Sequence, residues 1–170
     1  MGIMSFIKEA GEKLFGHKDA EAAAKQAQAA PDAATVQQKL ADANRTAADA
    51  IVAYIGTQNL SAEGLAVEFD ALSSSVTVSG QASDQATKEK ILLCCGNVGG
   101  VAGVNDLLTV AEPADESQYH TVERGDTLSA IAKKFYGNAN AYMKIFEANK
   151  PMLGHPDKIY PGQLLRIPPA

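Results

Sequence analysis

Tyr119-His-Thr-Val-Glu-Arg-Gly-Asp-Thr-Leu-Ser129 and Ile159-Tyr-Pro-Gly-Gln-Leu-Leu-Arg-Ile167 open and close the last part of this 170-residue chain. The first stretch contains the β-branched pair Thr121-Val122 and then Arg124-Gly125-Asp126, a turn whose aspartate can cap a following helix. The second stretch turns at Pro161-Gly162 into an apolar run. Both ends of this segment are therefore predicted to be strands.

Two helices are predicted between these strands. Their apolar faces recur at steps of three and four residues, through Leu128, Ile131, Ala132 and Phe135 in the first and Tyr142, Ile145, Phe146 and Asn149 in the second. Gly137-Asn138 ends the first helix, and Lys150-Pro151 ends the second because the residue before a proline disfavours helical geometry. Residues 119–170 thus form a βααβ unit.

This βααβ unit resembles the lysin motif (LysM) in its order of strand, Gly-Asp-Thr-Leu, Ile-Tyr-Pro-Gly-Gln and Leu-Arg-Ile-Pro. The resemblance implies a binding module with a shallow groove for glycan that contains N-acetylglucosamine. The groove residues that it implies are Gly125, Asp126, Thr127, Leu128, Met152, Ile159 and Tyr160. The alternative is that the domain packs on its neighbour and leaves this groove unused.

Residues 47–111 predict a second unit with the element order αββαβ. A helical face ends at Gly56, two alternating segments around Ser73–Ser75 indicate a hairpin, a second helix starts after Asp84, and a strand follows through Leu107–Val110. That order, with Val-Thr-Val-Ser-Gly in its middle and Gly-Val-x-x-Val-Asn-Asp near its end, resembles the BON domain. Residues 112–118 are polar, contain a proline and are predicted to be a linker.

The residues before the BON-like unit are predicted to be helical. Residues 1–16 place one apolar face at helical steps, through Ile3, Met4, Ile7, Ala10, Gly11, Leu14 and Phe15. We expect this amphipathic helix to pack on its own BON-like domain, because its polar face lacks the cationic excess that favours a membrane surface. Residues 17–46 are rich in alanine and are predicted to be a solvated helical connector. The fold class is therefore α+β.

Charge and composition exclude several classes of partner. The chain has a net charge of −5, divided into +3 over residues 119–168 and −8 over the rest, so no basic stripe favours nucleic acid. No apolar run approaches the roughly 20 residues of a membrane-spanning helix. The N-terminus lacks the basic head and apolar centre of an export signal, which predicts a cytoplasmic location. Cys94 and Cys95 are expected to be buried, free thiols.

No catalytic constellation is recognisable in the sequence, which predicts that the protein is not an enzyme. His17, His120 and His155 are scattered, without companions at metal-ligand or triad spacing, and are expected in surface or turn positions. The glycine cluster in residues 96–100 follows a predicted helix. It has two interpretations: a helix-capping loop, or a set of converging backbone carbonyls that suits a large, weakly hydrated cation.

The whole arrangement resembles the Kbp family of small bacterial cytoplasmic potassium-binding proteins. The shared marks include residues 6–14, 86–92, 96–100, 136–140 and 144–153, while the long alanine-rich stretch, Phe15 and Cys94-Cys95 depart from the family pattern. The resemblance implies a potassium ion held by backbone carbonyls, with rubidium and caesium as substitutes and a contact between the BON-like and LysM-like units. The carbonyls that we expect as ligands belong to Ile7, Ala10, Phe15, Gly96, Val98 and Gly100. The alternative function is an envelope module that binds peptidoglycan.

Overall fold

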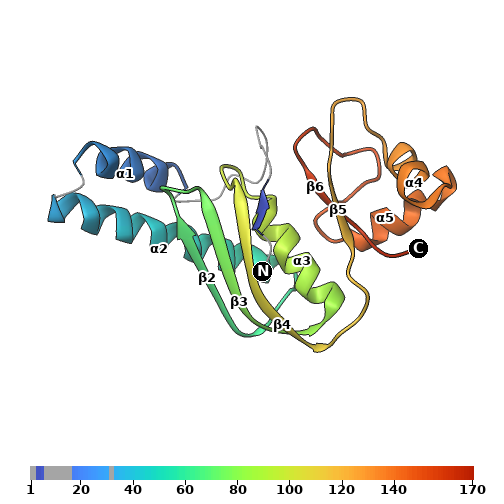
Figure 1. Ribbon diagram of the computed structural model, residues 1–170, viewed down its shortest axis with the longest axis horizontal. Coiled ribbons are helices and arrows are strands. Elements are labelled where there is room, and N and C mark those ends of the chain that lie inside the picture. Colours follow the sequence, from blue (N-terminus) through green and yellow to red (C-terminus); the bar gives the residue numbers. More distant parts are fainter. Residues whose placement is uncertain (1–2, 6–16, 31–32) are drawn as a thin grey trace.

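The computed structural model describes residues 3–5, 17–30 and 33–170, which form an α+β fold with two units along the chain (Figure 1). The first unit contains a four-stranded sheet in the order β1-β4-β3-β2. Its elements are β1 (Ile3–Ser5), α1 (His17–Ala29), α2 (Ala34–Thr57), β2 (Glu63–Asp70), β3 (Ser75–Asp84), α3 (Gln85–Gly96) and β4 (Gly103–Glu112). The second unit is a two-stranded sheet with helices. Its elements are β5 (Gln118–Thr121), α4 (Leu128–Tyr136), the 3-10 turn η1 (Ala139–Ala141), α5 (Tyr142–Ala148) and β6 (Leu164–Ile167).

The central part of the first unit follows the expected αββαβ order. β2 and β3 form an antiparallel hairpin, and its tip contains the predicted serine cluster. α3 then crosses over, so that β4 pairs in parallel with β3. The Asp84 carboxylate caps α3 as predicted, because its Oδ1 accepts a hydrogen bond of 2.8 Å from the Thr87 amide.

The helical expectation for residues 3–5 is wrong, because these residues form the short edge strand β1. Ile3 pairs with Asn105 and Ser5 with Gly103 in an antiparallel ladder along β4. An amphipathic pattern of three residues fits either element, and the open edge of β4 supplies backbone partners that decide between them. The rest of the predicted N-terminal helix lies outside the described residues.

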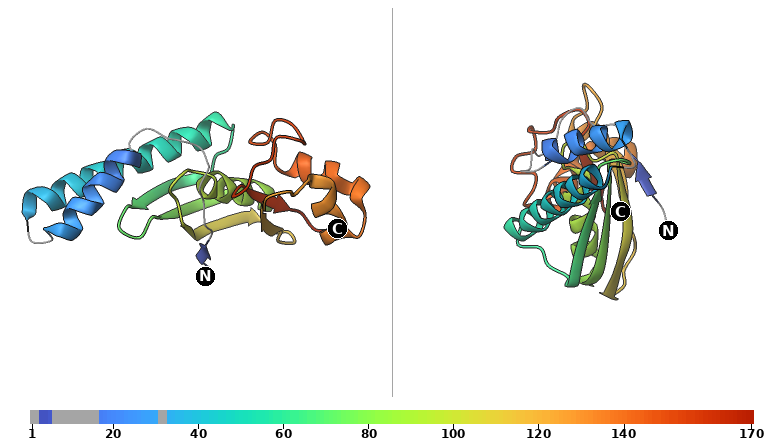
Figure 2. Two further views of the ribbon diagram at one scale, coloured as in Figure 1. Left: turned by 90° about the horizontal axis from the view of Figure 1, so that it is seen from above. Right: turned by 90° about the vertical axis from the view of Figure 1, so that its left-hand side faces the viewer.

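Residues 17–29 and 34–46 are helical as predicted, but the expectation that they are solvated is wrong, because α1 and α2 form a packed helical hairpin. α2 continues without a break through the expected boundary at residue 47, and α1 lies against it. The buried face of α1 consists of alanines at three- and four-residue steps, namely Ala20, Ala23, Ala24 and Ala27. Such small side chains allow two helix axes to approach closely. Figure 2 shows this hairpin extending beyond the end of the sheet.

α3 is the central element of the fold, because it is covered from two directions. One side packs on β3 and β4 and another contacts β6 of the second unit. The five consecutive residues Ile91–Cys95 are therefore all buried, although a helix with one solvent-facing side would expose some of them. Both cysteines are free and buried, as expected, and burial raises the pKa of the Cys95 thiol. No helix in the described ranges has the length and apolar character needed to span a membrane.

The second unit has the expected βααβ order around its own core. Its buried side chains come from α4, α5, β6 and the loops between the elements, and include Val122, Leu128, Ile131, Ile145, Leu153 and Leu165. The capping prediction for Asp126 is wrong by one residue, since Thr127 Oγ1 accepts the capping hydrogen bond from the Ala130 amide at 3.1 Å. Asp126 instead accepts a hydrogen bond from the Glu123 amide at 2.9 Å and pairs with His120 Nε2 at 2.8 Å.

Candidate functional site

The glycine loop predicted as an ion site lies at the carboxyl end of α3. The helix ends at Gly96, and the Asn97 amide donates to the carbonyl oxygens of Leu93 and Cys94 at 3.0 and 3.2 Å. The chain then turns towards β4 through Gly100, whose φ of +85° is the left-handed conformation that glycine adopts without strain. The loop thus gathers several peptide groups within one turn after the helix.

The electrostatics at this end of α3 favour a cation. A helix carries a partial negative charge at its carboxyl end, and the last turn of α3 contains no basic side chain to neutralise it. A cavity of about 220 Å³ adjoins Gly100 and is lined also by Glu21 of α1 and by Phe69, Ala71 and Ser74 of the hairpin. The loop and the helix end therefore contribute negative potential to one region, whereas the Glu21 carboxylate is already paired with Lys25 Nζ at 2.9 Å.

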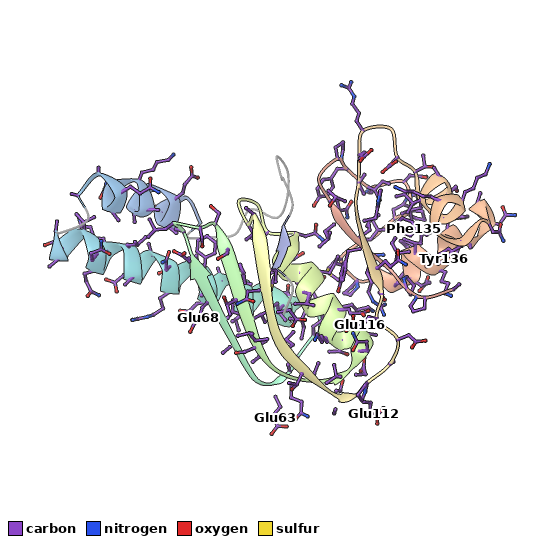
Figure 3. The ribbon with its side chains drawn as sticks, in the orientation of Figure 1. Glu63, Glu68, Glu112, Glu116, Phe135 and Tyr136 are labelled. Carbon is purple, nitrogen blue, oxygen red and sulfur yellow. The ribbon has the colours of Figure 1, made fainter. Side chains whose placement is uncertain are left out.

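The wider surface of the first unit is acidic as well. Figure 3 labels Glu63 and Glu68 on β2, Glu112 at the end of β4 and Glu116 in the linker, and all four are exposed. Exposed carboxylates attract cations in general, although salt screens this attraction beyond about 8–10 Å. They raise the local cation concentration without selecting one ion from another.

The structure brings together three of the predicted ligands. Gly96, Val98 and Gly100 lie in the same loop, with Val98 buried and its carbonyl accepting a hydrogen bond of 3.2 Å from the Val101 amide. Ile7, Ala10 and Phe15 lie outside the described residues. In the ranges that the structure describes, no group of three or more His, Cys, Asp or Glu side chains is placed to hold a metal. The expected ligands in those ranges are backbone oxygens.

One residue of this loop was missed by the sequence analysis. The Asn97 side chain points into the second unit, where its Nδ2 donates to the Leu164 carbonyl at 3.0 Å and its Oδ1 accepts from the Leu164 amide at 2.9 Å. Asn97 is only 5% exposed. A polar residue directly after a fully apolar helical run was the available signal, since buried polar groups require partners.

A buried ion pair joins the two units near the other end of α3. Glu89 is 2% exposed, and its Oε2 lies 2.5 Å from Arg166 Nε on β6. Its Oε1 accepts hydrogen bonds from Gln85 Nε2 at 2.9 Å and from the Ser117 amide at 2.7 Å. Burial alone raises the pKa of Glu89, but the hydrogen bonds from Ser117, Gln85 and Arg166 outweigh it and hold that pKa below its usual value.

The residues predicted for a glycan groove are only partly available. Gly125 adopts φ +93° in the turn that leads to Asp126 and Thr127. Leu128, however, is 3% exposed within the core of the second unit. Met152 packs against the first unit, where Cys94 Sγ lies 3.2 Å from its Sδ. The half-buried Ile159 and Tyr160 complete the predicted set, and Ile159 packs on the core of the second unit.

Comparison with known proteins supports both units. The LysM domain model matches residues 120–168, and the BON domain model matches residues 44–112. The chain is 47% identical to the potassium binding protein Kbp of Escherichia coli O6:H1 over 172 aligned residues, which cover 99% of each chain. It is also 42% identical over 82 residues to an uncharacterised protein of Deinococcus radiodurans, covering 42% of this chain and 32% of that protein. An uncharacterised protein of Bacillus subtilis, YqbP, is 40% identical over 58 residues, covering 29% of this chain and 26% of YqbP.

Proposed function

The chain belongs to the family of the potassium binding protein Kbp, and from that premise we propose that it is a cytoplasmic protein that binds potassium as a sensor or buffer. The observation that carries this proposal is the length of the match, which runs through nearly the whole of both chains. It therefore includes the N-terminal segment together with both domains. The proposed role is binding, and it requires no catalytic group.

The chemistry of the loop supports potassium over other common cations. Potassium is large and weakly hydrated, so neutral backbone carbonyls can replace its water shell. Magnesium holds its water tightly and is usually bound through carboxylates. We expect the ligands to be the carbonyls of Ile7, Ala10 and Phe15 on one side and of Gly96, Val98 and Gly100 on the other. Rubidium and caesium should then replace potassium, while sodium, lithium and magnesium should not.

A site built from these two groups of carbonyls would change the conformation of the chain. Its ligands lie more than eighty residues apart in the sequence, so the ion would hold the N-terminal segment against the end of α3. A ligand that binds only the folded state at about 100 times its Kd adds roughly 2.7 kcal/mol of stability. For a chain of this size, that corresponds to a rise of roughly 5–10 °C in the melting temperature.

The test compares thermal melts and calorimetric titrations in potassium chloride and in sodium chloride at equal ionic strength. We expect a higher melting temperature in potassium and a binding heat that sodium does not produce. Gly100→Ala places a side chain at a positive φ within the loop. Gly125→Ala is the matched control, because Gly125 also has a positive φ but lies in the second unit, with open space around an added Cβ.

Both glycine variants should lose about 1–2 kcal/mol of stability in sodium, from the strain of a left-handed alanine. Only Gly100→Ala should also lose the additional stabilisation by potassium. Identical melting temperatures of the unsubstituted protein in the two salts, with no heat specific to potassium, would refute the proposal. Cell fractionation tests the cytoplasmic location, which a processed periplasmic chain would contradict.

The second candidate function is binding of peptidoglycan, which the LysM match favours. Its groove would use Gly125–Leu128 with Met152, Ile159 and Tyr160. The packing of Met152 on the first unit weighs against an open groove on that side. Sedimentation with purified peptidoglycan tests this function directly, and a protein that stays in the supernatant contradicts it.

A further inference from the structure

Two asparagine side chains satisfy the outer edge of β6. β6 pairs with β5 on one side. On the other side, Asn97 exchanges two hydrogen bonds with the peptide groups of Leu164, at 2.9 and 3.0 Å. Asn149 likewise accepts a hydrogen bond from the Arg166 amide and donates one to the Arg166 carbonyl, both at 2.8 Å. A side-chain amide offers one acceptor and two donors, so each asparagine acts as a single residue of a neighbouring strand.

The two asparagines belong to different units. Asn149 follows α5 and therefore completes β6 from within the second unit, with a further hydrogen bond of 2.7 Å from its Nδ2 to the Ile145 carbonyl. Asn97 follows α3 and belongs to the first unit. If the two units separate, the amide and carbonyl of Leu164 lose the Asn97 side chain as their partner. Unpaired groups of this kind are costly while they remain buried.

Asn97 is also part of the backbone of the glycine loop. Its φ of −94° and ψ of 3° set the direction in which the chain leaves α3. Its side chain is held at both polar atoms by β6, which restrains the rotation of the peptide groups on either side of it. Those peptide groups carry the carbonyls of Gly96 and of Asn97 itself, next to the expected ligand Val98.

We propose that Asn97 is a positioning residue that couples the affinity of the potassium site to the packing of β6 against α3. This inference rests on the proposed potassium binding and names how that site is regulated. When β6 packs against α3, Asn97 holds the loop carbonyls in place. When β6 moves away from α3, the loop relaxes and the affinity for potassium falls. By linkage, potassium must also hold the two units together.

The first experiment replaces Asn97 with aspartate, which has nearly the same shape. Aspartate still accepts from the Leu164 amide but places an oxygen against the Leu164 carbonyl, where Asn97 donates. Its added negative charge by itself favours a cation, so a fall in potassium affinity would come from the lost contact and not from charge. We expect the potassium concentration at half-saturation to rise by about tenfold or more, which corresponds to the loss of a buried hydrogen bond with one group left unsatisfied. Melts in sodium chloride establish that the variant is folded.

The matched control is Glu89→Gln, which weakens the contact between the units at the other end of α3. Residue 89 lies eight positions before residue 97, or about 12 Å along the helix axis, so this change does not touch the loop. Because Asn97 still binds Leu164 in Glu89→Gln, we expect this change to lower stability in sodium but to shift the potassium midpoint much less than Asn97→Asp. Equal shifts in the two variants would show that Asn97 has no special position and would overturn the proposal.

The second experiment needs no substitution at Asn97. In a Cys95→Ala protein, Cys94 is the single thiol, and its sulfur contacts Met152 of the second unit. Its rate of reaction with dithionitrobenzoate therefore reports separation of the two units. We expect potassium to slow this reaction at least severalfold relative to sodium, and Asn97→Asp to remove that difference.

The outcomes separate the two proposals. If the unsubstituted protein shows no stabilisation by potassium, the proposed function fails and the coupling fails with it. If the protein binds potassium while the labelling rate of Cys94 is the same in both salts, the coupling alone is refuted. An unchanged potassium midpoint in Asn97→Asp refutes the coupling in the same way.

Discussion

The ion pair between Glu89 and Arg166 should contribute strongly to the stability of the interface between the two units. The perturbation is Arg166→Met, which keeps much of the volume of the side chain and removes its charge. The two side chains are 3% and 10% exposed, so the carboxylate that loses its partner would remain largely buried. Removal of one partner of a buried pair costs about 3–5 kcal/mol.

The lower end of that range is expected here. Glu89 would keep its hydrogen bonds from Gln85 and from the Ser117 amide, which still stabilise a carboxylate. We therefore expect Arg166→Met to lower the free energy of unfolding by about 3 kcal/mol and the melting temperature by roughly 6–12 °C. Glu89→Gln should cost about 2–3 kcal/mol, because it leaves the buried guanidinium without its counter-charge.

The double variant Glu89→Gln with Arg166→Met measures the coupling. A neutral amide beside a thioether leaves no charge uncompensated, so the double change should cost about 2 kcal/mol less than the sum of the single changes. Urea unfolding followed by far-UV circular dichroism is the assay, since the chain contains no tryptophan for fluorescence. Strictly additive single effects, or a loss below about 0.5 kcal/mol in Arg166→Met, would show that the pair does not stabilise the interface.

Three further predictions follow from the same contacts and caps. The pKa of Glu89 is lowered in the folded state, so the stability that its carboxylate gives the fold is present above the unfolded pKa and is lost as the pH falls through the folded pKa. Urea unfolding between pH 7 and pH 3 should show this loss of stability, and Glu89→Gln should show less of it. Asp84→Ala removes the N-cap of α3 and should lower the free energy of unfolding by about 1 kcal/mol in the same assay, whereas Asp84→Asn should retain most of the stability of the unsubstituted protein. Gly80→Ala should cost more than about 1 kcal/mol, because its Cβ would lie 3.0 Å from the Glu63 carbonyl at a φ of +136°; a melting temperature equal to that of the unsubstituted protein would contradict this.

The αββαβ and βααβ element orders were predictable because the sequence patterns that indicate them are local. In the second unit, helical periodicity, a stop at Gly137 and a turn at Gly162 each depend on neighbouring residues, and the structure places positive φ at both glycines. The same holds for the hairpin around Ser73–Ser75 and for the cap at Asp84. These elements have one favourable conformation before any tertiary contact is considered.

The errors arose where tertiary contacts decide the structure. Residues 3–5 pair with β4, a partner about one hundred positions away that no local pattern reveals. The alanines of α1 do recur at helical steps, but their small side chains gave no indication of burial, because burial of alanine releases little hydrophobic free energy for each residue. Close approach of α2 was required to bury them.

The candidate site divides in the same way. The glycines of the loop were recognisable from sequence because a positive φ and exposed helix carbonyls have a compositional signature. Asn97 was not recognisable as a contact to β6, since its partners are backbone atoms of Leu164, and backbone atoms leave no mark in the sequence. The same limit applies to the expected potassium ligands, which are all carbonyl oxygens and are identified by family resemblance.

α3 explains why stability and the proposed ion binding should respond to different residues of one interface. The helix lies between the sheet and β6, and its hydrogen-bonded contacts with β6, through Glu89 and the C-cap residue Asn97, are buried beside the apolar contact of Leu164. Glu89 lies within its regular turns, where a lost ion pair changes the energy of docking but leaves the backbone hydrogen bonds of the helix intact. Asn97 lies where those bonds end, so its side chain is among the few restraints on the direction of the chain. A change at Glu89 should therefore act mainly on stability, and a change at Asn97 on the geometry of the loop that would hold the ion.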